Sequence, residues 1–279
     1  MEKIILAVDA LNPDRSALEF ASYLGRLTRS DITGVFLEDL ASEERPVLKE
    51  LHGMPYMDWE ANSLSGSYQY KVSLIERNIE YFKEGCINRG VNYKLHRDRG
   101  LPVHELIEES RYADLLIVDT ETSFSKMYEG IPTEFVRDVL KKTECPVIIA
   151  PENFEEVEEI IFTYNGTSSS LFAMKQFSYL FPQFHHKKAI LLTVTDSGEW
   201  EEPDDLKLKE WLETHYSDYT YEVLKGKPGI KLFDYLYQRK NIFIVMGAYG
   251  RNAVSRFFKA SEAENIIKTI SQPIFIAHF

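Results

Sequence analysis

The sequence predicts an α/β protein made of two tandem units, each a parallel β-sheet with helices on both faces. Short apolar, β-branched runs alternate with segments whose apolar residues recur at helical spacing, which is typical of strand–helix–strand units. The same order of motifs occurs twice along the 279 residues, a length that suits two domains. We therefore expect one domain at residues 1–151 and a second at 152–279.

Each unit opens with a strand, a loop and a helix. Residues 3–8 form an apolar run that ends in Asp9, and apolar or small residues then recur at helical spacing over 16–28. In the second unit the run 158–164 ends before Asn165, and a helical pattern follows. The two openings therefore predict equivalent strand-to-helix turns.

The later parts of the two units also match. Gly100 and Gly226 each begin a Gly-x-Pro motif that precedes a helical pattern and then an apolar strand. Each unit closes with a helix, a proline and a last apolar strand, at 145–150 and 272–277. Strands that are apolar throughout indicate a parallel sheet buried on both faces. Ligands bind outside the carboxyl ends of such strands, so we expect any site in the strand-to-helix loops.

An insert near residues 41–68 makes the first unit longer than the second. It lies between a second strand at 31–37 and a long helix from about Tyr70 to Asn88, and prolines and glycines interrupt its periodicity. The insert is either a surface excursion or a lid or interface. A surface excursion is the ordinary interpretation of such an insert, and apolar residues, which are poorly placed in a solvated loop, suggest the alternative. Those residues are Met54, Tyr56, Met57 and Trp59.

The fourth strand of the second unit runs into a loop that could hold a phosphate. Gly247 and Gly250 would let backbone amides approach an anion, and Ser261 opens a helix whose first N–H groups favour negative charge. Ser261 with Glu264 also fits a helix capping box, and the glycines also fit a plain turn. The charged residues between Gly247 and Ser261 are all basic: Arg251, Arg256 and Lys259.

These motifs together resemble the universal stress protein family. The features in common are the polar residue that ends the first strand, the Gly-x-Pro before the third helix, and a tail of the form Gly-x2-Gly-x9-Gly-(Ser/Thr). The whole chain, except the insert, resembles a tandem member with a degenerate first domain. The resemblance implies a Rossmann-like, five-stranded parallel sheet in each domain and a stress-response function. In ATP-binding members the tail wraps the phosphates and ribose of ATP or another adenine nucleotide.

Carried onto the second unit, the resemblance assigns a nucleotide site with two departures from the family pattern. Asn165 stands where the family prefers Asp, and Ala260 stands where the third glycine belongs. Asn still forms hydrogen bonds, and Ala keeps its N–H but disfavours positive φ. The assigned residues are Asn165 and Gly166, Val194 or Thr195 at the end of the second strand, and Gly247, Gly250, Arg251, Ala260 and Ser261 in the phosphate loop.

The first unit departs much further from the family pattern. Asp119 and Glu121 place carboxylates where phosphates would sit, and like charges repel. We therefore expect any nucleotide in the second domain only, although Asp9 keeps the acid at the end of the first strand. The positions that correspond to Gly247, Gly250 and Ser261 are Asp119, Thr122 and Thr133.

Composition limits the partners. The net charge of −12 argues against nucleic acid, because phosphate neutralisation needs a basic surface. The sequence shows neither a signal peptide nor an apolar run long enough for a membrane span, so we expect a cytoplasmic protein and no membrane contact. Cys86 and Cys145 lack the spacing of a metal site or disulfide framework. We expect no bound metal.

Three functions fit these observations. The first is a nucleotide-binding stress-response module, and the second is an interaction protein that has lost its nucleotide site. The third is a slow ATPase, for which no residue is identified as base or nucleophile. We also expect the last strands of the two units, 147–150 and 274–277, to pair as an intramolecular pseudo-dimer, because an exposed apolar edge favours aggregation. A homodimer is compatible with the resemblance.

Overall fold

The computed structural model describes residues 1–40, 44–52, 54–62, 64–125, 127–200, 205–247 and 266–277. The first half contains β1 (Lys3–Asp9), α1 (Arg15–Thr28), β2 (Asp31–Leu37), β3 (Glu44–Leu51), β4 (Met54–Ala61), α2 (Gly66–Asn88), β5 (Tyr93–Asp98), α3 (Pro102–Ser110), β6 (Leu115–Val118), α4 (Glu134–Lys142) and β7 (Val147–Ile149). The second half contains β8 (Glu159–Thr163), α5 (Ser168–Leu180), the 3-10 turn η2 (Pro182–Phe184), β9 (Lys188–Thr195), α6 (Asp205–His215), β10 (Tyr219–Lys225), α7 (Pro228–Tyr237), β11 (Ile242–Gly247) and β12 (Ile274–Ala277). Residues 266–269 are also helical.

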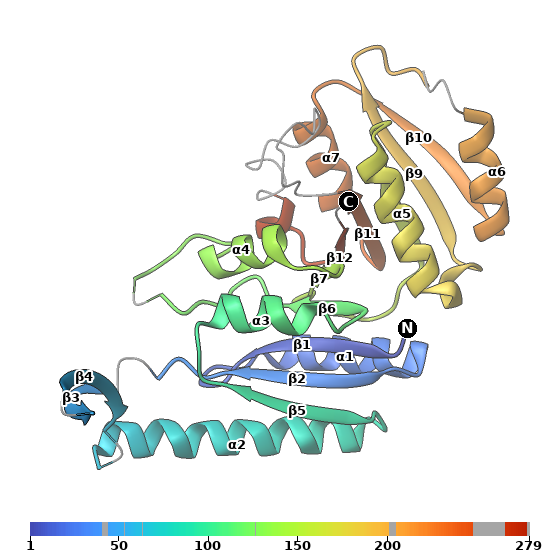
Figure 1. Cartoon of the computed structure of the whole chain (residues 1–279). Helices are drawn as coiled ribbons and strands as arrows, with labels where there is room; N and C mark the ends of the chain where they lie inside the picture. Colours follow the sequence, from blue (N-terminus) through green and yellow to red (C-terminus); the bar gives the residue numbers. More distant parts are fainter. Residues whose placement is uncertain are drawn as a thin grey trace.

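Ten of these strands form one sheet in the order β10-β9-β8-β11-β12-β7-β6-β1-β2-β5 (Figure 1). Each half contributes five strands that are parallel to one another. The α/β class predicted from the sequence is confirmed. The five strands of each half join in one continuous ten-stranded sheet rather than forming two separate five-stranded sheets.

The two halves meet at an antiparallel pair of strands. Ile148 of β7 lies opposite Phe275 of β12, and both side chains are fully buried. This contact confirms the predicted pairing of the two final strands. Pairing removes an exposed apolar edge from each half, which is the physical reason for expecting it.

Helices cover both faces of the sheet. Alternate side chains along β1 go to opposite layers, because successive residues of a strand point to opposite faces. Ile4 and Leu6 pack in the layer of α1, α2, α5 and α6, whereas Ile5 packs in the layer of α3, α4 and α7. None of the helices in the described ranges combines the length and the apolar character that crossing a membrane requires.

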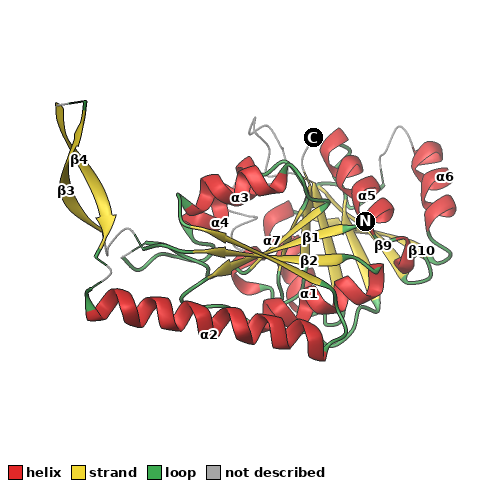
Figure 2. Cartoon of the chain, turned by 60° about the horizontal axis from the view of Figure 1, so that its bottom comes forward, coloured by secondary structure: helices red, strands yellow, loops and turns green. Residues whose placement is uncertain are grey.

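The insert contains a β-hairpin that projects from the body (Figure 2). Among the strands of the described ranges, β3 and β4 pair with each other alone, and they are joined by a two-residue loop in which His52 has a positive φ of 51°. The sequence did not reveal this hairpin because prolines interrupt the strand periodicity. The long helix α2 begins at Gly66, earlier than expected, because the Ser65 side chain caps its first turn.

Candidate functional site

In the second half, the carboxyl end of β8 leads into a tight turn built on Asn165. The Asn165 side-chain oxygen accepts hydrogen bonds from the backbone N–H (3.2 Å) and the hydroxyl (2.6 Å) of Thr167. Thr167 in turn caps α5, because its hydroxyl oxygen accepts from the N–H of Ser170. Gly166 between them has a φ of 72°, a conformation that favours glycine. Asn165 and Gly166 therefore hold the first turn of α5 against the sheet.

Gly247, the last residue of β11, lies against that same helix end. A Cβ atom at this position would be 2.5 Å from the backbone nitrogen of Ser170 and 2.6 Å from its Cα. Only glycine fits there without a backbone shift. The close approach places the end of β11 beside the first N–H groups of a 13-residue helix, which have no partners within the helix. Such a helix end attracts anions.

Val194 and Thr195 are the two residues at the end of β9 that could contact a ligand through the main chain. The structure favours Val194. The carbonyl of Thr195 accepts from Gly226, and its hydroxyl accepts from Gly198, so both groups serve the neighbouring loops. Parallel strands direct alternate residues toward opposite neighbours. The Leu192 carbonyl accepts from Tyr164, so the main-chain groups of Val194 point to the same side, beyond the last residue of β8.

The remaining predicted ligands lie outside the described residues. These are Gly250, Arg251, Ala260 and Ser261. The phosphate loop therefore stays a prediction. The helix expected after it is present at 266–269, where Ile266 and Ile267 are buried against the sheet.

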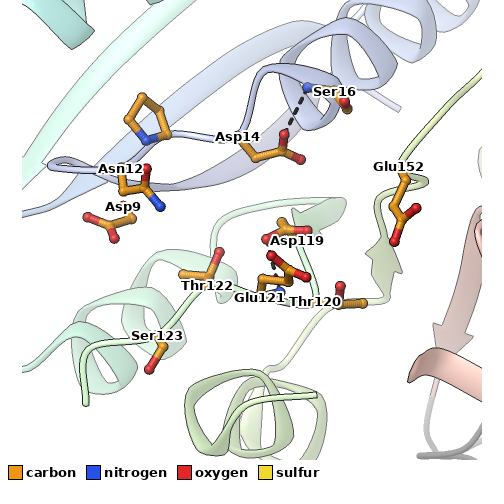
Figure 3. Close-up of a pocket in the computed structure, with 11 residues that line it drawn as sticks. Asp9, Asn12, Asp14, Ser16, Asp119, Thr120, Glu121, Thr122, Ser123 and Glu152 are labelled. Carbon is orange, nitrogen blue, oxygen red and sulfur yellow. Dashed lines mark hydrogen bonds between the residues drawn. The ribbon is translucent and has the colours of Figure 1, made fainter. Parts of the chain in front are cut away.

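In the first half, the corresponding position holds a polar pocket of about 480 Å³ (Figure 3). It lies at the carboxyl ends of β1 and β6, where parallel strands bring their loops to one edge. Five of its lining residues are acidic, and none is basic. The lining residues are Asp9, Asn12, Pro13, Asp14, Ser16, Asp119, Thr120, Glu121, Thr122, Ser123 and Glu152.

The carboxylates of this pocket disfavour one another's charge. Burial, together with the nearby charges of Asp14 and Glu121, raises the pKa of Asp119 to about 6, against an opposing hydrogen bond from the Glu121 N–H. Burial also raises the pKa of Asp9. A phosphate group would add negative charge to a site that already resists it.

The structure brings Thr122 and Thr133 together. The Thr133 hydroxyl donates to the Thr122 carbonyl and also accepts from the N–H of Val136, which caps α4. The loop after β6 thus returns to the start of the next helix. By the internal repeat, these positions correspond to Gly250 and Ser261.

One residue of the pocket was missed from the sequence. Glu152 follows β7, and Figure 3 shows its side chain beside the loop after β6. The sequence could have revealed Glu152, because it follows a predicted strand and the carboxyl ends of parallel strands meet at one edge. The site residues predicted for that unit lie after its first and fourth strands alone.

No protein-family model matches the chain, and no curated protein matches it either. Solved structures do match. The crystal structure of a universal stress protein from Archaeoglobus fulgidus DSM 4304 aligns over 99% of this chain and 98% of its own, with a TM-score of 0.68 and 15% sequence identity. The chain has the universal stress protein fold. At this identity the likeness concerns the fold, and it extends over both halves.

Two further universal stress protein structures match. A candidate universal stress protein from Pseudomonas aeruginosa UCBPP-PA14 aligns over 100% of this chain and 93% of its own, with a TM-score of 0.58 and 12% identity. A shorter universal stress protein from Archaeoglobus fulgidus, solved in complex with dAMP, covers 54% of this chain and 98% of its own, with a TM-score of 0.36 and 15% identity. The two long matches have the size of this chain.

Proposed function

We propose that this chain is a tandem universal stress protein whose second domain, residues 152–279, binds ATP or another adenine nucleotide. The first domain, residues 1–151, serves as its structural partner. The observation that carries the proposal is the contact of Gly247 with the first turn of α5. It joins a glycine at a strand end to a helix N-terminus, the combination that binds phosphate through backbone amides.

The strand ends supply the rest of the proposed site. Asn165 and the main chain of Val194 lie at the ends of neighbouring strands β8 and β9, where a nucleoside would reach them. The loop from Gly250 to Ser261 would then close over the phosphates, as the return of the first-half loop from Thr122 to Thr133 suggests. Arg251 would add positive charge.

The first-half pocket supports the asymmetry of the proposal. Its carboxylates occupy the position equivalent to a phosphate site, and the raised pKa of Asp119 reflects a place where added negative charge is unfavourable. We expect one nucleotide per chain.

Two measurements test this function. The purified protein is heated, and released nucleotides are identified by chromatography. Calorimetric titration with ATP then gives the number of sites per chain. We expect one site. Two equivalent sites, or neither bound nucleotide nor ATP binding in folded protein, would overturn the proposal.

Variants of the loop test how phosphate is held. Backbone amides should supply most donors, so Gly250→Val should weaken ATP binding more than Ser261→Ala, which removes one hydroxyl and a helix cap. Both proteins must first be shown to fold by circular dichroism. Loss of binding in Ser261→Ala with normal binding in Gly250→Val would contradict the backbone cradle.

A second candidate function is an interaction protein that binds no nucleotide. One observation favours it: the Asn165 oxygen is already engaged by both donors of Thr167, so it has less capacity for a ligand. Absence of ATP binding in folded protein would select this alternative.

A further inference from the structure

We propose that the acidic pocket of the first half binds a small aliphatic polycation, a molecule of the polyamine class with two or more ammonium groups. The pocket lies at the carboxyl ends of β1 and β6, where the second half would hold its nucleotide (Figure 3). Nucleotide binding by the second half is not required for this site. The two halves would then bind ligands of opposite charge at equivalent places in the fold.

The pocket concentrates negative charge that the protein leaves uncompensated. None of its five carboxylates forms an ion pair within the described part of the chain, and none of the lining residues is basic. A ligand that carries positive charge would supply the missing attraction. The five carboxylates belong to Asp9, Asp14, Asp119, Glu121 and Glu152.

Another buried acid of the same half shows the contrast. The side chain of Glu38 is fully buried, and it accepts hydrogen bonds from two arginine side chains. In the pocket, the charges that act on Asp119 come from two further acids, Asp14 and Glu121, and together with burial they raise its pKa. A cation among these groups would turn mutual repulsion into attraction.

A buried hydroxyl group also points into the pocket. Only 9% of the surface of Thr122 is exposed, and its hydroxyl has no hydrogen-bond partner among the described residues. The contact between Thr122 and Thr133 uses the Thr122 carbonyl instead. Figure 3 shows the hydroxyl directed from the loop after β6 towards the loop after β1. Buried polar groups normally have a partner, so this hydroxyl is placed to accept from an ammonium group of a ligand.

The shape of the pocket suits an elongated cation. Its volume of about 480 Å³ is enough for a small organic molecule, and its lining comes from the loops after three strands, β1, β6 and β7. In Figure 3, Asp9 and Glu152 lie on opposite sides of the pocket, with Asp119 and Glu121 between them. A chain with ammonium groups at intervals would reach several of these carboxylates at once.

A single metal ion makes a different demand on the carboxylates. Calcium and magnesium need oxygen atoms that converge to about 2–2.6 Å from one point. The acidic side chains here come from separate loops, and among the described residues no group of three His, Cys, Asp or Glu is placed to hold a metal ion. Charge distributed around a cavity matches charge distributed along a ligand.

The first experiment is calorimetric titration of the full-length protein with spermidine. We expect one site per chain, with an affinity that falls as salt is added, because salt screens exposed charges. A neutral diol of the same chain length should not bind. Mg²⁺ and N-acetyl-lysine amide each present one cationic centre, as a metal ion or a lysine of a partner protein would, and should bind at least about tenfold more weakly.

The second experiment removes two carboxylates of the pocket. Asp119→Asn with Glu121→Gln should weaken spermidine binding about a hundredfold, because two charge-assisted contacts are lost. The matched control is Glu80→Gln with Glu84→Gln, which removes the same net charge from exposed positions on α2. The control should stay within about twofold of the parent, since exposed distant charges contribute little.

The third experiment tests the buried hydroxyl. Thr122→Val keeps the shape of the side chain but removes the hydroxyl, and should weaken spermidine binding about tenfold. Thr122→Ser keeps the hydroxyl and should bind like the parent. Circular dichroism first establishes that each variant is folded. ATP titration of the same variants should give unchanged results, because the proposed nucleotide site is in the other half.

Four results contradict the polycation site. They are the absence of spermidine binding by folded parent protein, equal binding of the neutral diol, equal loss of binding in the control on α2, and parent-like binding by Thr122→Val. Mg²⁺ or N-acetyl-lysine amide binding as tightly as spermidine would also refute it, in favour of a metal ion or a partner's lysine. Failure to bind ATP with normal spermidine binding would refute the proposed nucleotide function alone.

Discussion

At the scale of single residues, two aligned positions at strand ends differ in chemistry between the two halves. In the second half, Gly247 allows β11 to approach the N-terminus of α5. In the first half, the aligned residue is Asp119, a carboxyl group that lies among other acids. A glycine beside a helix end suits an anion, whereas a carboxylate in a polar pocket repels one. The difference in chemistry at one aligned position therefore separates the two halves.

The replacement Asp119→Asn should stabilise the protein at neutral pH. The pKa of Asp119 is raised from 3.8 to about 6 in the folded protein, so folding favours the protonated form. The favourable contribution is complete below about pH 4 and is lost as the pH rises through about 6. We expect a gain of about 2 kcal/mol at pH 8 and none at pH 4, measured by urea unfolding at both pH values. An equal gain at both would refute the role of charge.

Gly247→Ala should destabilise the protein by about 1–3 kcal/mol, because the added Cβ would displace the backbone of Ser170. Thermal and urea unfolding measure the loss. Gly66→Ala is the control, since a Cβ there would meet no atom within 4 Å. Comparable stability of the two variants would show that the close approach at Gly247 does not exist in solution.

At the scale of elements, a buried carboxylate stabilises the base of the β3–β4 hairpin. The side chain of Glu38, which follows β2, is fully buried and accepts hydrogen bonds from Arg97 (2.5 Å) and Arg99 (2.9 Å). The two arginines lie at the end of β5 and just beyond it. The cluster therefore ties together the ends of two neighbouring strands where the chain leaves the sheet for the β3–β4 hairpin. A buried charge is costly unless it is paired in this way.

Glu38→Gln should lower the free energy of unfolding by about 2 kcal/mol, because it removes the charge that both guanidinium groups face. The control is Glu76→Gln. Glu76 is an exposed partner of Arg97, with 55% of its side chain accessible, and its replacement should cost less than about 1 kcal/mol. Equal effects in urea unfolding would indicate that burial of Glu38 contributes nothing.

At the scale of the whole molecule, the junction of β7 and β12 makes the two halves one structure. Phe275 at the junction also packs against Phe177 of α5, with ring centroids 5.3 Å apart. The side chains on both sides of the junction belong to two core layers that continue from one half to the other. We therefore expect the halves to unfold together.

Ile148→Ala, in the first half, should lower the stability of the second half as well. Removal of a fully buried side chain opposite Phe275 should cost about 3 kcal/mol. Trp200 and Trp211 report on the second half by fluorescence, and a Trp59→Phe background removes the tryptophan of the β3–β4 hairpin. A fluorescence transition that stays at the parent midpoint while circular dichroism shifts would mean that the halves unfold separately.

The sequence by itself determined the elements and their order. The apolar run at 31–37 coincides with β2, the repeat of strand, turn and helix predicted two similar α/β units, and the resemblance implied five strands in each. These features are local, because side-chain periodicity and turn residues depend on near neighbours in the chain. The sequence also predicted the carboxylates of Asp119 and Glu121 at the site, since the internal repeat aligns them with the loop after β11.

The tertiary structure decided what depends on distant parts of the chain. It placed Glu152 in the same pocket as Asp119 and set Gly247 against Ser170, because these arrangements arise only when strand ends meet at one edge. It also joined the two sheets through Ile148 and Phe275. The hairpin of the insert depends on cross-strand pairing, which tolerates Pro46 and Pro55 where their nitrogens face outward. The residue pattern of one strand does not show which way a proline nitrogen faces, so only the tertiary structure reveals the β3–β4 hairpin.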